Sequence, residues 1–181
     1  MSVYIVLFRG VGGATQLPTK PLAAALEAAG FRSVKTYIAS GNVVLATERD
    51  ASEVRDSVAA IARRDFGFAK HIMVADRSDW SRLIAANPFP QASGTALHGF
   101  LLEKKPDMAR VAALEALSNE TERVAFRDGF LYFHAPEGFG RAKLPPIIDR
   151  TLGVATTARN WNTVLKLRDL AAAVAEADGW T

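Results

Sequence analysis

The sequence predicts an α+β protein built from two small halves, and three observations support this. Short apolar runs typical of strands alternate with longer segments in which apolar residues recur every three or four positions, as they do in helices. In the first half these segments follow one another as strand, helix, strand, strand, helix, strand. Residues 89–95 contain proline, serine and glycine and indicate a linker. We therefore expect one domain at residues 1–88 and a second, ending in a helix, at residues 96–181.

The first half shows local signals for each element. We expect its elements, in order, at residues 3–8 (strand), 20–29 (helix), 34–39 and 42–47 (strands), 51–66 (helix) and 71–75 (strand). Thr19 is the expected cap of the first helix, and Asp50 with Glu53 forms a capping-box pair before the second. A tight turn at residues 40–41 joins the two middle strands into a hairpin. The order βαββαβ is the ferredoxin-like order.

The second half is also expected to mix strands and helices. After a short helix around residues 80–86, the expected strands are 97–102, 124–126 and 130–134, followed by a short extended segment at 155–158. A helix bearing Met108 and Leu114 follows the first of these strands. Pro145 and Pro146 begin another helix, and the last helix ends the chain. Arg127-Asp128-Gly129 indicates a hairpin turn. No internal repeat is strong enough to identify.

The composition excludes several classes of protein. Hydrophobic residues make up 49% and charged residues 23% of the 181, which is typical of a globular chain. The absence of cysteine excludes disulfides, thiolate catalysis and Cys-ligated zinc. A net charge of +3 permits nucleic acid without favouring it, because such binding neutralises roughly 6 to 10 phosphates. No run reaches the roughly 18 apolar residues of a membrane span, so we expect a cytoplasmic protein without a membrane partner.

The motifs assign no cofactor, metal or catalytic residue. The loop G-V-G-G-A-T at residues 10–15 lacks the lysine of a P-loop and the third glycine of a dinucleotide fingerprint. It either approaches an anion through backbone N–H groups or needs glycines for its backbone angles. His71, His98 and His134 lack metal-ligand spacing, and no base accompanies Ser40. The strand at 42–47 has no aromatic residue on which RNA bases could stack. The missing nucleophile–base pair favours a binding protein over an enzyme.

Two blocks in the second half combine polar or cationic residues with a helix start. In T-A-R-N-W-N-T-V-L-K-L, residues 157–167, Asn160 or Asn162 can cap the last helix, which leaves Arg159 and Trp161 unexplained. We expect Trp161 to pack as a structural anchor at the domain junction, and the alternative is that asparagine, Arg159 and the helix N-terminus form a polar site for a carboxylate or phosphate. In G-F-G-R-A-K, residues 138–143, Arg141 and Lys143 are either solvated or line an anion site beside the following helix.

Several blocks in order resemble the bacterial family known as domain of unknown function 1697. They are Arg9-Gly10, Thr36-Tyr37-Ile38 with Ser40-Gly41-Asn42-Val43-Val44, Asn87-Pro88-Phe89-Pro90, Gly138-Phe139-Gly140-Arg141 with Lys143-Leu144, and Thr157 with Arg159-Asn160-Trp161-Asn162-Thr163 and Lys166-Leu167. The resemblance implies a cytosolic bacterial protein of two α+β parts, the first ferredoxin-like, and no established activity, cofactor or catalytic residue. Family members usually carry a loop resembling G-I-N-V-G-G followed by a basic residue. Residues 10–16 lack that asparagine and that cation, which puts ligand binding at this loop in doubt.

The sequence leaves two functional hypotheses. The first is a binding protein, or an uncharacterised enzyme, that acts on a small anionic ligand held between the two halves. Its candidate ligand-binding residues are polar or cationic and lie in loops beside glycines: Arg9, Ser40, Asn42, Arg141, Lys143, Arg159, Asn160 and Asn162. The alternative is a nucleic-acid or protein interaction module without catalysis. No motif indicates an oligomeric state.

Overall fold

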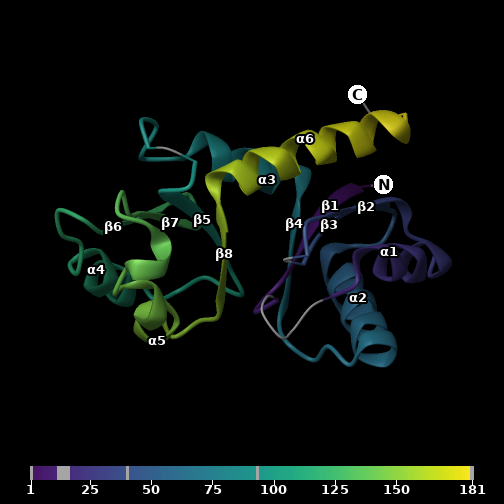
Figure 1. Ribbon diagram of the computed structural model, residues 1–181, viewed down its shortest axis with the longest axis horizontal. Coiled ribbons are helices and arrows are strands. Elements are labelled where there is room, and N and C mark those ends of the chain that lie inside the picture. The colour runs from purple at the N-terminus through teal and green to yellow at the C-terminus, as the bar shows by residue number, and fades with distance from the viewer. Residues whose placement is uncertain (1, 12–16, 40, 93, 180–181) are drawn as a thin grey trace. The chain divides into compact units, whose positions relative to one another are not determined.

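The structure is a computed structural model that describes residues 2–11, 17–39, 41–92 and 94–179 (Figure 1). It contains two four-stranded antiparallel sheets, with strand orders β2-β3-β1-β4 and β6-β7-β5-β8. The predicted α+β class is confirmed. The predicted loop at residues 10–16 lies largely outside the described residues, as does the candidate site residue Ser40.

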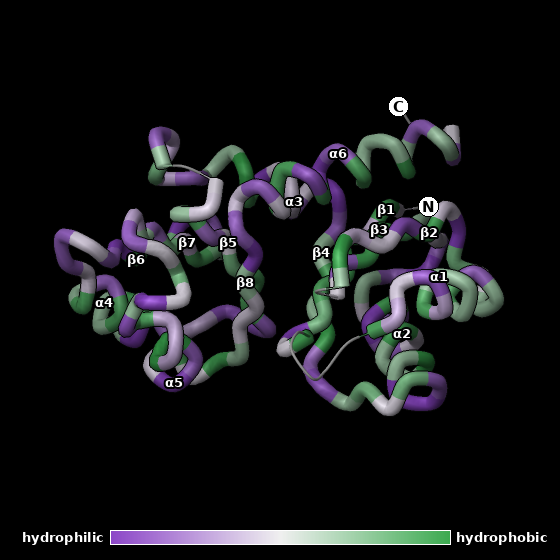
Figure 2. The backbone as a smooth tube through the Cα atoms, viewed as in Figure 1, coloured by the Kyte–Doolittle hydropathy of each residue, from purple (hydrophilic) through white to green (hydrophobic). Residues whose placement is uncertain are grey.

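The first half has the predicted ferredoxin-like order. Its elements are β1 (Ser2–Phe8), α1 (Thr19–Ala28), β2 (Arg32–Tyr37), β3 (Asn42–Thr47), α2 (Ala51–Phe66) and β4 (Ile72–Asp76). One face of the sheet packs on α1 and α2, where Val6 and Phe8 meet Leu26 and Val58. Figure 2 shows the alternation of hydrophobic and hydrophilic residues along α2 that this one-sided packing requires. Ile5, on the other face of β1, is also fully buried, which explains why this strand is apolar without alternation.

The second half repeats this topology, although no repeat was identified in the sequence. Its elements are β5 (Leu97–Leu102), α4 (Met108–Glu115), β6 (Arg123–Arg127), β7 (Phe130–His134), the 3-10 turns η1 (Phe139–Arg141) and η2 (Pro145–Ile147), α5 (Ile148–Leu152) and β8 (Thr156–Asn160). The sheet order is again second, third, first, fourth. The helices differ: α2 has 16 residues and α5 only 5. Because topology depends on the order of elements rather than on matching residues, the repeat leaves no clear trace in the sequence.

The chain divides into two compact units that do not coincide with its sequence halves. One unit is Met1–Ser81 with Lys166–Thr181, and the other is Arg82–Leu165. The boundaries fall inside α3 (Arg77–Ala85) and α6 (Trp161–Ala177). The predicted domains, 1–88 and 96–181, differ from these units at residues 82–88 and 166–181. The first unit therefore contains the end of α6, which begins in the second unit. The second unit contains the end of α3, which begins in the first.

Side-chain contacts bind these exchanged segments to their units. In the first unit, Arg32 Nε lies 3.4 Å from Asp178 Oδ1, close to the end of α6. In the second unit, the Tyr132 hydroxyl donates a buried 2.7 Å hydrogen bond to the Leu83 carbonyl near the end of α3. Leu83 also packs against Gly99, where a Cβ would approach it to 3.3 Å. A cut between residues 88 and 96 would break both sets of contacts, so we expect neither half to fold well alone.

Helix and turn signals were predicted with mixed success. The capping box of Asp50 and Glu53 is present. The prediction that Thr19 caps α1 is wrong, because α1 begins at Thr19 and Pro18 occupies the cap position without a side-chain hydrogen bond. The turn between β6 and β7 is the predicted hairpin, with Asp128 at φ 50° and Gly129 at φ 86°, as a two-residue type I′ turn requires.

Candidate functional site

Two candidate residues of the first unit, Arg9 and Asn42, lie at the same end of the first sheet. Asn42 pairs with Leu7 across β1 and β3. Asn42 is 1% exposed, and its Nδ2 donates to the Tyr37 carbonyl at 3.0 Å, so it closes the hairpin between β2 and β3. The Arg9 backbone N–H donates to the His71 carbonyl at 3.0 Å, which fixes the point where the chain leaves β1.

The glycine of the Ser40-Gly41-Asn42 block has a steric explanation. Gly41 has φ 72°, and a Cβ there would lie 2.6 Å from Phe8 Cβ and 2.9 Å from Val11 Cγ2. No other residue fits this close approach of the hairpin to β1. Ile38, in the same turn, has φ 48° and is 50% exposed. A β-branched residue with a positive φ is strained. The surrounding hairpin must therefore stabilise this conformation of Ile38.

The cationic block of the second unit is organised by a residue that the sequence did not single out. The buried carboxylate of Glu122 accepts hydrogen bonds from the backbone N–H groups of Lys143 and Leu144, each at 2.8 Å. These N–H groups precede η2 and are the ones that an external anion would use. The side chains of Arg141 and Lys143 are exposed. The protein therefore supplies its own anion at this place.

The asparagines of the R-N-W-N-T block have separate structural roles. Asn160 Oδ1 accepts from the Thr163 N–H at 2.9 Å, so Asn160 is the cap of α6. The Trp161 N–H donates to the Gly94 carbonyl at 2.9 Å, and the Trp161 ring packs on Gly99. Asn162 lies against Gly94, where a Cβ would be 1.9 Å from Asn162 Oδ1. The block thus caps a helix and also holds the segment that precedes β5.

Arg159 places a cation on the edge strand β8. Its cross-strand neighbour is Gly99, and its Nη1 donates to Thr157 Oγ1 at 3.0 Å and to the Ala158 carbonyl at 2.7 Å. Burial lowers the pKa of Arg159 to about 10. The guanidinium is still protonated at neutral pH, but its charged form is less stable than in water, so a nearby anion would be favourable.

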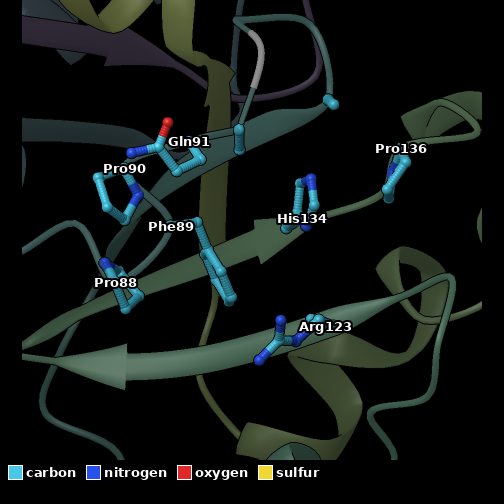
Figure 3. A pocket seen from close by; sticks show the side chains of 9 residues that line it. Pro88, Phe89, Pro90, Gln91, Arg123, His134 and Pro136 are labelled. Carbon is cyan, nitrogen blue, oxygen red and sulfur yellow. The ribbon is translucent and has the colours of Figure 1, made fainter.

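The segment held by the R-N-W-N-T block forms one wall of a pocket of about 460 Å³ in the second unit (Figure 3). We call this the proline–aromatic pocket, and its lining residues are Pro88, Phe89, Pro90, Gln91, Ala92, Ala96, Arg123, His134 and Pro136. The Asn87 side chain shapes its entrance segment, because Asn87 Oδ1 accepts from the Phe89 N–H at 2.9 Å. The sequence indicated a linker at residues 89–95 and a block of the family resemblance at residues 87–90, but no pocket.

Three side chains determine the chemistry of the pocket. The rings of Phe89 and His134 lie 5.5 Å apart between centroids, tilted by 31°, and the Arg123 guanidinium carbon lies 5.3 Å from the Phe89 centroid. His134 Nδ1 is buried and has no hydrogen-bond partner among the described residues. Burial, and to a lesser extent the charge of Arg123, lowers the pKa of His134. The imidazole is therefore neutral at physiological pH.

Strand pairing brings the cation and the imidazole together. Arg123 on β6 is the cross-strand partner of His134 on β7, so both side chains leave the same face of the sheet. Arg159 belongs to this face as well, because Gly99 pairs with both Tyr132 and Arg159. A two-residue hairpin fixes the register of its strands, and this signal could have located the pair of Arg123 and His134 in the sequence.

The described part of the chain shows no candidate metal site and no candidate membrane span. Residues 2–11, 17–39, 41–92 and 94–179 contain no group of three or more His, Asp or Glu side chains that could hold a metal ion. Within the same ranges, no helix is both long enough and apolar enough to span a bilayer.

The fold and the pocket define the class of protein: a tandem ferredoxin-like α+β protein with a ligand-sized pocket. The chain belongs to the family described as "Protein of unknown function (DUF1697)", which matches residues 1–132. This confirms the resemblance found in the sequence, although the blocks at 138–144 and 157–167 lie beyond the matched residues. The structure is similar to that of the conserved bacterial protein SP0830 from Streptococcus pneumoniae, with 17% identity and a TM-score of 0.75 over 94% of this chain and 98% of that one. At this identity the similarity concerns the fold alone. No curated protein matches the chain.

Proposed function

We propose that the protein binds a small anionic ligand, bearing a carboxylate or a phosphate, in the proline–aromatic pocket. The observation that carries this proposal is the placement of the Arg123 guanidinium and the His134 imidazole around one concave space of about 460 Å³. Pockets of this size enclose small molecules and use a few polar groups to orient them. No nucleophile and base adjoin in this pocket, so binding rather than catalysis is the activity proposed.

The electrostatics of the two polar residues suit an anion. The Arg123 guanidinium supplies a cation with several N–H donors, and it lies over the Phe89 ring. Nδ1 of His134 is buried, which leaves Nε2 as the ring nitrogen that can reach a ligand, and Nε2 donates or accepts depending on which nitrogen carries the proton. An anion beside Arg123 would offset the charge that contributes to the low pKa of His134. Binding should therefore raise this pKa and become tighter as the pH falls below neutrality.

The residues predicted from the sequence enter this proposal in different ways. Asn162 lies against Gly94 beside the pocket segment, Asn160 caps α6, and Arg159 adds positive charge on the same face of the sheet. Arg9, Asn42, Arg141 and Lys143 are not part of the proline–aromatic pocket. They remain candidate residues for a ligand held between the two halves, and Arg9→Ala represents them in the test below.

A thermal-shift panel of simple anions, carboxylates, sugar phosphates and nucleotides tests the proposal. A ligand at about 100 times its dissociation constant stabilises by roughly 2.7 kcal/mol, which for a chain of this size raises Tm by about 5–10 °C. Arg123→Ala should abolish this shift. The matched control is Arg150→Ala, which removes an exposed cation of the same unit that does not line the pocket. A ligand shift that survives in Arg123→Ala and disappears in Arg159→Ala or Arg9→Ala would move the site elsewhere.

One observation favours nucleic acid as the alternative ligand. A second hollow of about 580 Å³ is lined by the cations Arg82, Lys104 and Lys105. Asp128 also lines this hollow. Its Oδ1 lies 3.4 Å from Arg82 Nη1, which reduces the positive charge of the hollow. Short oligonucleotides at two salt concentrations separate the hypotheses, because the logarithm of the affinity for single strands falls by about 0.7 per phosphate contact for each tenfold rise in salt. Binding that is lost at high salt and in Lys104→Ala would support nucleic acid over the pocket.

A further inference from the structure

We infer that the ligand of the proline–aromatic pocket carries a flat aromatic ring beside its anionic group. This inference rests on the proposed function and specifies the ligand class of the same site. The pocket has a volume of about 460 Å³, whereas an apolar cavity of roughly 150 Å³ already accommodates benzene. Acetate or inorganic phosphate would leave most of this space to water. An organic body attached to the anion would fill it.

The walls of the pocket favour a flat body over a branched aliphatic one. Five of the lining residues carry rings: Pro88, Phe89, Pro90, His134 and Pro136. The lining includes no leucine, isoleucine, valine or methionine, and its other apolar members are two alanines. Figure 3 shows the Phe89 ring between the prolines of its own segment and His134. The proline rings are rigid, and the planar rings of Phe89 and His134 can pair with another aromatic ring in an offset or edge-to-face arrangement.

The position of Phe89 provides a surface for such a ring. Phe89 is only half-buried, and it lies on a segment fixed by the proline on each side and by the hydrogen bond from its N–H to Asn87. A phenylalanine that is exposed on a rigid segment loses little conformational entropy when a ligand covers it. Covering the exposed part of its side chain also removes apolar surface from water. Both effects favour a ligand that stacks on Phe89.

The position of Arg123 relates the anionic group to the ring. Its guanidinium carbon lies 5.3 Å from the Phe89 centroid, and His134 contacts the same phenyl ring. A ring that covers Phe89 therefore brings a substituent on its edge within reach of Arg123. A carboxylate or phosphate bonded directly to the ring satisfies this geometry. Benzoate and phenyl phosphate are the simplest members of the class.

Calorimetric titration of the full chain with five probes tests the inference. Benzoate and phenyl phosphate combine a ring with an anion, and they distinguish a carboxylate from a phosphate ligand. Cyclohexanecarboxylate has the same charge and a similar size as benzoate but is not flat, benzyl alcohol has the ring without the charge, and acetate has the charge alone. We expect benzoate or phenyl phosphate to bind, and cyclohexanecarboxylate to bind roughly two- to tenfold more weakly than benzoate.

A matched pair of variants assigns the ring preference to Phe89. Phe89→Leu keeps an apolar side chain and removes the flat surface, so the ratio of benzoate to cyclohexanecarboxylate affinity should fall to about one. Phe139→Leu is the control, because Phe139 stacks on His98 and does not line the pocket. It should leave the ratio unchanged.

The outcomes separate this inference from the proposed function. Equal affinity of the wild-type chain for cyclohexanecarboxylate and benzoate overturns the aromatic ligand and leaves anion binding intact. Benzyl alcohol binding as tightly as benzoate overturns the anionic ligand and leaves the ring preference intact. No binding by benzoate or phenyl phosphate at millimolar concentration overturns both.

Discussion

Removing the carboxylate of Glu122 should release the segment that connects β7 to α5. In the native structure this buried group accepts two backbone hydrogen bonds, from Lys143 and Leu144, each 2.8 Å long. Glu122→Ala would leave the buried N–H of Leu144 and the partly buried N–H of Lys143 without their acceptor. A hydrogen bond to a charged group contributes about 1.5–3 kcal/mol, so the two together contribute about 3–6 kcal/mol.

The expected loss is large enough to measure by thermal unfolding. For a chain of this length each kcal/mol changes Tm by about 2–4 °C, so Glu122→Ala should lower Tm by roughly 6–24 °C. Glu122→Gln retains one acceptor but loses the charge and turns an amide N–H towards a backbone donor, so it should fall between the alanine variant and the wild type. Glu137→Ala, which removes an exposed carboxylate from the loop after β7, is the control and should change Tm by less than about 2 °C.

Chemical rescue makes this prediction specific to the two N–H groups. Glu122→Ala leaves space and two unpaired donors where a carboxylate stood, so formate should raise the Tm of this variant and not that of the wild type. A Tm for Glu122→Ala within about 2 °C of the wild type would refute the role assigned to Glu122. A large loss that formate cannot reverse would show that the packing of the side chain, rather than its hydrogen bonds, is what matters.

Three further predictions concern other contacts of the second unit. Tyr132→Phe removes the hydrogen bond that attaches α3 to the sheet, and its loss should cost about 1–3 kcal/mol in urea unfolding; no change would show that this contact is dispensable. Gly94→Ala should destabilise the chain less in an Asn162→Ala background, because the added Cβ would otherwise lie 1.9 Å from Asn162 Oδ1; a double-mutant cycle should give a coupling of about 0.5–3 kcal/mol, and additive effects would separate the two segments. Burial lowers the pKa of His98 from 6.5 to about 4, so the stability that depends on its neutral form is complete above pH 6.5 and is lost as the pH falls towards 4; His98→Phe should reduce this acid sensitivity in Tm measured from pH 7 to pH 4, and an unchanged pH profile would contradict the assignment.

The first half of the fold was predictable because its signals are local. Asp50 with Glu53 starts α2, and the apolar period identifies α1 and α2 as one-sided helices. The repeated topology of the second half was missed because α5 is a helix of 5 residues preceded by two 3-10 turns, which carries little periodic signal. The sequence did not predict that α3 ends in the second unit and α6 in the first. The predicted domain boundary rested on the linker composition of residues 89–95, which is a local signal. Which sheet a helix end covers is decided by long-range packing.

The candidate site was predicted only in part, for a related reason. The sequence identified the R-N-W-N-T block and asked why it contains more than a cap requires. The structure answers that Trp161 and Asn162 hold the backbone at Gly94. Arg123 and His134 were not selected as a pair, because they adjoin through the register of the β6–β7 hairpin. Glu122 was not selected at all, since a buried acceptor for backbone N–H groups has no sequence pattern.

A crystal structure of the chain grown with saturating benzoate or phenyl phosphate would show whether the proline–aromatic pocket binds the ligand. We expect ligand density in the proline–aromatic pocket, with the ring against Phe89 and the anionic group within hydrogen-bond distance of Arg123 or His134. Density for the ligand at another place, with this pocket holding only water, would contradict the account.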